Sequence, residues 1–139
     1  MADAKPMKLH HVSLAVNDAK AVAETWEKVL GIGPWKLNAE MGGVDAKGRN
    51  WKANEYWAQI GDTVIELIEP LEGRIVQSRY LDETGPGVHH MAFEVESVEE
   101  TLAHMLENGA ELVFHEPGNN WAYLRTGGPD GVIVEISQH

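Results

Sequence analysis

The sequence predicts an α+β fold built from two copies of one structural unit, and three observations support this prediction. First, residues 9–16 and 88–95 are near-copies that each carry a double histidine. Second, each copy is followed by a segment with the capping residues and apolar spacing of an amphipathic helix. Third, each half closes with a hydrophobic strand that carries one glutamate, at residues 64–68 and 132–136. A repeated pattern of this kind indicates that both halves adopt the same local structure.

The first element of each half is a strand. Residues 8–16 alternate, so that Val12, Leu14 and Val16 share one face and His11 lies on the other. The same alternation in residues 88–95 places His90 opposite the large apolar side chains. If helices cover the apolar face, both histidines stand on the uncovered, concave face of the sheet.

A helix is predicted after each of these strands. Asp18 can cap a helix that stops at Gly31, and Ser97 with Glu100 forms a capping box for a helix that stops at Gly109. Each helix has one apolar stripe that can pack against the sheet. The two stripes consist of Val22, Trp26, Val29 and Leu30, and of Val98, Leu102, Met105 and Leu106.

The other segments complete the two modules. Residues 36–50 are rich in glycine, asparagine and lysine, which predicts a long loop over the concave face. We expect a first module at residues 7–70, a linker with a short helix at 71–86, and a second module at 87–138. The remaining strands are predicted at residues 51–60, 63–68, 112–115, 121–125 and 131–136.

Composition narrows the functional class. The 139 residues include no cysteine, which excludes disulfides and thiolate metal sites. A net charge of −11 argues against nucleic-acid binding, because phosphate contacts need clustered lysine and arginine. We expect no signal peptide, because the first ten residues include Asp3 and two lysines without an apolar run, and no segment has the roughly 20 apolar residues that span a bilayer. We therefore expect a cytoplasmic protein that does not enter membranes.

The duplicated histidines and glutamates predict a metal site. His11, His90, Glu66 and Glu135 occupy equivalent places in the two halves, and two imidazoles with two carboxylates are a ligand set for a divalent ion. The alternatives are histidines bonded to backbone and glutamates exposed at a sheet edge. The repetition favours the metal, because an isolated glutamate inside a hydrophobic strand is costly to bury. The preceding His10 and His89 are interpreted as half-buried structural residues.

These motifs resemble those of the vicinal oxygen chelate superfamily, which includes glyoxalase I, methylmalonyl-CoA epimerase, extradiol dioxygenases and bleomycin-resistance proteins. The resemblance lies in residues 61–71, 87–95 and 131–136 and extends over nearly the whole chain. It implies two tandem βαβββ modules that form an open cup-shaped mixed sheet, with helices on the outer face. The epimerase branch is the most similar. Glu66 departs from that branch, which commonly has glutamine there, and fits bacterial-type glyoxalases.

The resemblance implies a divalent-metal-dependent epimerase or isomerase that moves a proton next to a carbonyl. Its ligands would be His11, His90, Glu66 and Glu135, holding one ion of Co, Ni, Zn, Mn or Fe. Glu135 and Glu55 are the candidate catalytic carboxylates, although Glu55 can equally be a solvated strand residue. The substrate would carry neighbouring oxygens, as an acyl-CoA thioester or an α-keto hemithioacetal does.

Three other functions stay open. A glyoxalase I-like lyase would use the same four ligands, and an extradiol dioxygenase would need only two histidines and one carboxylate. A resistance protein would bind a small molecule in the same cup without a metal.

Open sheet edges on both modules also predict a homodimer. Whether each site is built within one chain or across the dimer is left open by the sequence.

Overall fold

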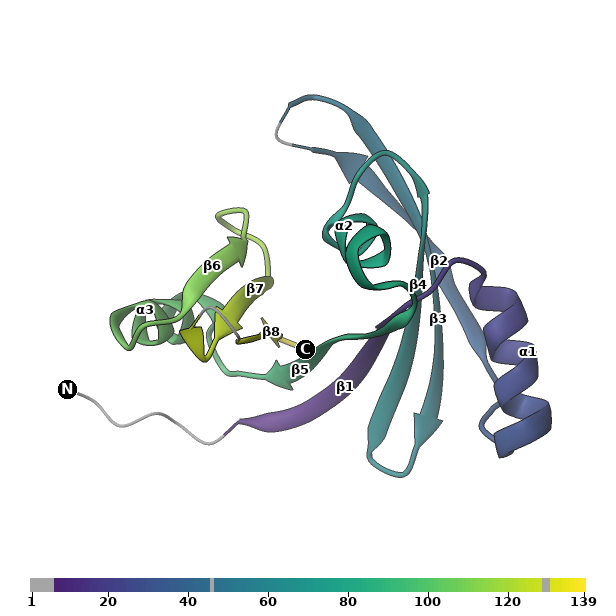
Figure 1. The fold of residues 1–139 in the computed structure, drawn as a ribbon. Helices are drawn as coiled ribbons and strands as arrows, with labels where there is room; N and C mark the ends of the chain where they lie inside the picture. Colours follow the sequence, from purple (N-terminus) through teal and green to yellow (C-terminus); the bar gives the residue numbers. More distant parts are fainter. Residues whose placement is uncertain (1–6, 46, 129–130) are drawn as a thin grey trace. The chain divides into compact units, whose positions relative to one another are not determined.

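The structure is a computed structural model that describes residues 7–45, 47–128 and 131–139. Two βαβββ modules follow each other, with α2 between them (Figure 1). The predicted α+β class and repeated module are confirmed. In chain order the elements are β1 (Lys8–Ala15), α1 (Ala19–Leu30), β2 (Lys36–Val44), β3 (Asn50–Ile60), β4 (Thr63–Glu72), α2 (Val76–Thr84), β5 (Gly87–Glu94), α3 (Val98–Glu107), β6 (Glu111–Phe114), β7 (Trp121–Thr126) and β8 (Val132–Ser137).

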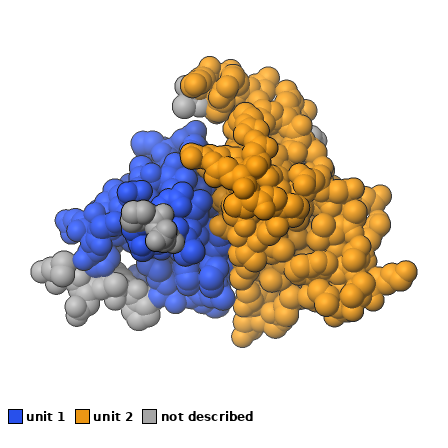
Figure 2. Space-filling view, viewed as in Figure 1, with its two compact units in different colours: residues 1–11, 90–139 blue, residues 12–89 orange. Residues whose placement is uncertain are grey.

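The chain divides into two compact units, drawn in different colours in Figure 2. We call residues 12–89 the central unit, and residues 1–11 with 90–139 the terminal unit. The division falls inside β1 and inside β5. His11, which belongs to the first half of the sequence, is therefore part of the same unit as His90 and the second half.

The central unit places α1 against one face of its strands, which follow the order β2-β3-β4-β1 (Figure 1). Ala19 and Ala23 of the helix are buried together with Leu67 of β4. Because side chains alternate along a strand, Glu66 lies on the opposite face from Leu67. Trp57 of β3 pairs directly with Glu66 and shares that uncovered face.

The terminal unit repeats this plan with the strand order β5-β8-β7-β6 and α3 as its covering helix. Its buried cluster consists of Val98, Leu102, Ala122, Leu124 and Ile136. Ala92 of β5 and Tyr123 of β7 both lie opposite Glu135 of β8 in the strand registers. Ile136, the next residue along β8, belongs to the cluster under α3, so Glu135 lies on the face away from the helix. Its nearest neighbours on that face are the cross-strand side chains.

The helix ends follow the predicted capping. The Asp18 side chain accepts a hydrogen bond from the Ala21 amide at 3.0 Å, and Gly31 ends α1 in the left-handed conformation at φ 70°. The Ser97 hydroxyl accepts from the Glu100 amide at 3.2 Å. The predicted stripe of α1 is wrong at its end, because Val29 is 70% exposed and Leu30 is 56% exposed. The small residues Ala19 and Ala23 form the buried face instead.

The predicted loop at residues 36–50 is also wrong. Lys36–Val44 is the strand β2, which pairs antiparallel with β3, and the Asp45 amide after β2 donates a hydrogen bond of 2.8 Å to the Arg49 carbonyl before β3. Gly42 and Gly43 have low strand propensity, which concealed the strand. A Cβ added to Gly43 would lie 3.0 Å from Nε1 of Trp51, so a larger residue at that position would push against the Trp51 ring. Among the described residues, none of the helices combines the length and apolarity needed to cross a bilayer.

Candidate metal centre

Three buried side chains of the terminal unit converge: His11, His90 and Glu135. Each offers one ligand atom, and these atoms all lie within 4.8 Å of one another. Nε2 of His11 lies 3.4 Å from Oε2 of Glu135, and Nε2 of His90 lies 4.0 Å from Oε1 of the same carboxylate. Both imidazoles thus direct the same ring nitrogen toward one carboxylate.

The strand pairing of the terminal unit produces this convergence. His90 lies on β5, two residues before Ala92, so both side chains are on the same face as Glu135 of the neighbouring β8. The ring of Tyr123 on β7 packs against His90 with the centroids 4.8 Å apart. The ring centroids of Trp121 and Tyr123 are 5.1 Å apart, so Trp121 adds aromatic surface to the same face. The contact of Tyr123 with His90 has no separate signal in the sequence.

The protonation state of His11 suits a ligand. Burial, together with the neighbouring imidazoles of His10 and His139, lowers the pKa of His11 to about 4. At neutral pH the ring is therefore uncharged and has one nitrogen lone pair available. A neutral imidazole is the form that binds metal.

His10 contacts the candidate ligand directly. Its Nδ1 lies 2.8 Å from Nδ1 of His11, at hydrogen-bond distance. The His10 ring also stacks on His139, with centroids 3.8 Å apart and planes only 8° from parallel. Nε2 of His139 in turn lies 2.8 Å from the Ser137 hydroxyl. His10 is half-buried, as the sequence predicted, but its ring faces a site residue.

The second histidine doublet is arranged differently. His89 is buried in the central unit and meets the Tyr80 ring edge-on, with centroids 5.2 Å apart and planes at 89°. Burial lowers the pKa of His89 to about 4. The two doublets are therefore alike in sequence but not in the contacts of their first members.

Glu66, the fourth predicted ligand, belongs to the central unit. It is 9% exposed, and its Oε1 accepts a hydrogen bond of 2.8 Å from the buried Ser13 hydroxyl. Ser13 follows His11 by two residues, so strand alternation alone indicated that its side chain lies on the uncovered face. The equivalent position in the second half is Ala92, which has no hydroxyl. The two glutamates are thus held by different neighbours.

Glu55, the candidate catalytic carboxylate, lies on β3 of the central unit and is half-buried. It pairs with Ile68 of β4, two positions along from the pair of Trp57 and Glu66. Glu55 and Glu66 consequently share one face. The Lys36 ammonium lies 5.1 Å from the centre of the Trp57 ring, at the distance of a cation–π contact.

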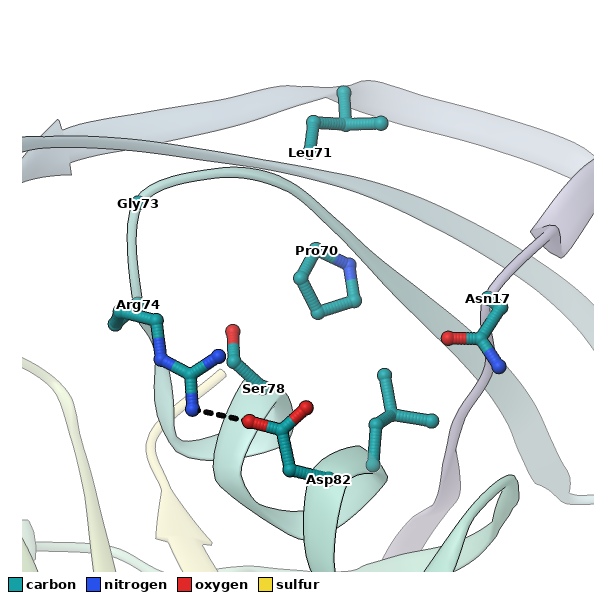
Figure 3. A pocket seen from close by; sticks show the side chains of 8 residues that line it. Asn17, Pro70, Leu71, Gly73, Arg74, Ser78 and Asp82 are labelled. Carbon is teal, nitrogen blue, oxygen red and sulfur yellow. Dashed lines mark hydrogen bonds and ion pairs between the residues drawn. The ribbon is translucent and has the colours of Figure 1, made fainter.

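A surface pocket of about 210 Å³ lies elsewhere in the central unit, between the end of β4 and α2 (Figure 3). An ion pair between Arg74 and Asp82 stands at one side of it. None of the predicted ligands lines this pocket, which consists of Asn17, Pro70, Leu71, Gly73, Arg74, Ser78, Leu81 and Asp82. The pocket therefore contributes nothing to the metal site.

Comparison with known proteins identifies the family. Residues 10–124 match the model of the Glyoxalase/Bleomycin resistance protein/Dioxygenase superfamily. The chain belongs to this superfamily. The resemblance inferred from the repeated histidines and glutamates is therefore confirmed.

Two curated proteins of this kind are similar along almost their whole length. The uncharacterized protein YqjC of Bacillus subtilis is 29% identical over 94% of this chain and 91% of its own. The ethylmalonyl-CoA/methylmalonyl-CoA epimerase of Cereibacter sphaeroides is 28% identical over 94% of this chain and 97% of its own.

Solved structures share the fold of this chain. A hypothetical protein from Bacillus halodurans superposes with a TM-score of 0.72 at 28% identity, covering 97% of this chain and 96% of that chain. A methylmalonyl-CoA epimerase in complex with methylmalonyl-CoA and NH4+ gives a TM-score of 0.71 at 21% identity, covering 95% and 94%.

Proposed function

We propose that this superfamily member is a divalent-metal-dependent epimerase that moves a proton at the carbon next to a carbonyl. The observation that carries the proposal is the convergence of His11, His90 and Glu135. Two imidazole nitrogens and one carboxylate oxygen are donors that suit Zn, Fe, Co, Ni or Mn and leave coordination positions for a substrate. The similarity to the Cereibacter sphaeroides epimerase supports an acyl-CoA thioester as the substrate class.

The proposed roles keep the candidate residues that the sequence predicted. His11, His90 and Glu135 of the terminal unit hold the ion. Glu66 is a ligand candidate from the sequence repeat alone. When bound, the ion supplies Lewis-acid stabilisation of the negative charge that develops on a substrate oxygen. Glu55 and Glu135 are the carboxylates that take a proton from the adjacent carbon and return one to it. Return of the proton to the opposite face inverts that carbon.

The metal is tested before the reaction. Protein purified without chelator or affinity tag should contain close to one equivalent of a divalent metal, or should take up one equivalent of Co²⁺ after dialysis. Glu135→Gln should lose this uptake, whereas Glu111→Gln, which removes an exposed charge from the same unit, should retain it. Less than about a tenth of an equivalent, with no gain on adding Co²⁺ or Ni²⁺, would contradict the metal site.

The reaction is tested by isotope exchange. The metal-loaded protein is incubated with 2-methyl-branched acyl-CoA thioesters in deuterated water, and deuterium at C2 is measured by mass spectrometry. We expect incorporation that depends on both the metal and Glu135. Full metal loading without any exchange across these thioesters would exclude the epimerase and leave the metal site intact.

A second candidate function is an Fe(II) extradiol dioxygenase. Two histidines and one carboxylate form the group in the terminal unit, and this is the ligand set of non-haem iron oxygenases. The hydrogen bond from Ser13 to Glu66 favours this alternative, because it engages one oxygen of the fourth candidate ligand. Oxygen consumption with catechols by the Fe(II)-loaded protein, without deuterium exchange in thioesters, would support it.

A further inference from the structure

The side of His11 that faces away from Glu135 is held by a second histidine. His11 uses Nε2 toward Glu135, at 3.4 Å, and Nδ1 toward His10, at 2.8 Å. The two rings are nearly perpendicular, with planes at 79° and centroids 5.1 Å apart. This geometry excludes stacking and aligns the two Nδ1 atoms for a nitrogen-to-nitrogen hydrogen bond.

His10 itself is fixed by a further support. Its ring lies flat against His139, and the Ser137 hydroxyl is within hydrogen-bond distance of His139. Ser137 ends β8, two residues after Glu135, so the same strand supplies a metal-ligand candidate and the support of His10. The result is a continuous row of contacts from β8 through His139 and His10 to His11.

We propose that His10 is a positioning residue that orients the His11 ring, so that Nε2 points toward Glu135 and His90. His139 acts behind it by holding the His10 ring in place. As a role in metal binding this inference rests on the proposed function. The pairing of the two rings, however, can be tested in the metal-free protein.

The hydrogen bond also determines which nitrogen of His11 can bind an ion. A histidine that binds metal through Nε2 carries its proton on Nδ1 and donates it to a neighbouring acceptor. In this protein the acceptor is Nδ1 of His10, which must then carry its own proton on Nε2. Metal-bound histidines more often donate to carboxylates or carbonyls, so an imidazole acceptor is a distinctive arrangement.

The pairing is measured by nitrogen NMR. In ¹⁵N-labelled, metal-free protein, above the ordinary histidine pKa of about 6.5, a proton shared by two nitrogens produces a scalar coupling between them. We expect this coupling between the Nδ1 atoms of His10 and His11, and its loss in His10→Phe. Phenylalanine retains a flat ring that can stack on His139 but has no acceptor.

The effect on the site is measured by metal affinity. The affinity for Zn²⁺ or Co²⁺, determined by chelator competition, should fall about 10- to 100-fold in His10→Phe, the range for loss of a partner behind a ligand. His10→Asn should recover most of it, because the amide oxygen can accept where Nδ1 accepted. His139→Ala should produce a smaller loss. His104→Phe, on α3 and without such a contact, is the control.

The outcomes separate this inference from the proposed function. If the wild-type protein bound metal but showed no coupling, and His10→Phe kept the wild-type affinity, the positioning role would be refuted and the metal site would stand. If the coupling were present and the wild-type protein bound no metal, the proposed function would fail and the role of His10 would be confined to the metal-free ring pair. Equal losses in His10→Phe and His10→Asn would also refute a role as hydrogen-bond acceptor.

Discussion

At the scale of single residues, Glu135 is the side chain on which the site depends. It sits in an otherwise apolar strand and is 8% exposed, and a carboxylate so placed is retained only with polar neighbours. The two imidazoles supply these neighbours from separate segments of the chain. The sequence predicted that these ligand candidates come together because both halves carry the same pattern. It did not predict the contact of His10 with His11, because His89, the equivalent residue, packs against Tyr80 instead.

Replacement of this carboxylate should separate binding from folding. Glu135→Gln keeps the size of the side chain and removes its negative charge, so we expect the metal affinity to fall more than about 100-fold, beyond the range for partners behind a ligand. The far-ultraviolet circular dichroism should remain unchanged. Isothermal titration with Co²⁺ measures the affinity, and a variant that binds as tightly as the wild-type protein would show that Glu135 is not a ligand.

Two buried histidines predict how the metal-free protein responds to acid. The pKa values of His11 and His89 are both lowered to about 4, from 6.5, chiefly by burial. The unfolded chain then binds more protons than the folded one between these values, so stability is lost as the pH falls from about 6.5 to about 4. Each histidine contributes a slope of at most about 1.4 kcal/mol per pH unit.

Urea denaturation at several pH values measures this slope. His89→Asn removes one histidine whose pKa is lowered by burial. The loss of stability between about pH 6.5 and about pH 4 should therefore be smaller in this variant than in the wild-type protein, each compared with its own stability at neutral pH. A stability that is constant from neutral pH down to about 4 would contradict the assignment of both rings as neutral in the folded protein.

At the scale of elements, local signals predicted what the chain does by itself, and pairing decided the rest. The caps of α1 and α3 were visible in the sequence because a capping side chain bonds to an amide three residues away. The strand β2 was missed because its glycines fit against Trp51, a contact between segments that composition does not reveal. The exposed end of α1 has the same cause, since apolar spacing does not show where the supporting sheet stops.

The cap of α3 should contribute measurably to the terminal unit. This helix buries Val98 and Leu102 against the strands that carry the site residues. Ser97→Ala removes the acceptor for the Glu100 amide and should lower the free energy of unfolding by about 1 kcal/mol. Ser97→Asp, which retains an acceptor, should lose little. Thermal denaturation of the wild-type protein and both variants measures the difference. A Ser97→Ala variant as stable as the wild-type protein would show that the hydrogen bond adds no stability.

At the scale of the whole molecule, both units have a strand at the end of their order, β2 in one and β6 in the other. Leu37 and Val44 on β2 are more than half exposed, and Leu112 on β6 is nearly so. Edge strands with exposed apolar side chains pair readily with another chain. This arrangement supports the homodimer that the sequence predicted.

A single charge at the edge tests this assembly. We expect the wild-type protein to have twice the monomer mass of 15.4 kDa in light scattering at micromolar concentration. Leu37→Lys, at an apolar position of β2, should shift the population toward the monomer, because a buried lysine is disfavoured in an interface. Leu106→Lys on α3 changes an exposed leucine away from the edge and is the control. A monomeric wild-type protein would refute the dimer.

The membership of His11 in the terminal unit has a consequence for the amount of the protein in a cell. His11, His90 and Glu135 lie far apart along the chain, so an ion bound by all three would be a reversible cross-link between these segments. A covalent cross-link over loops of comparable length stabilises a protein by about 3–5 kcal/mol. Quality-control proteases remove molecules according to how often they unfold, and differences of 1–2 kcal/mol already change abundance several-fold. The amount of this protein would therefore follow the supply of its metal, without any change in the rate of its synthesis.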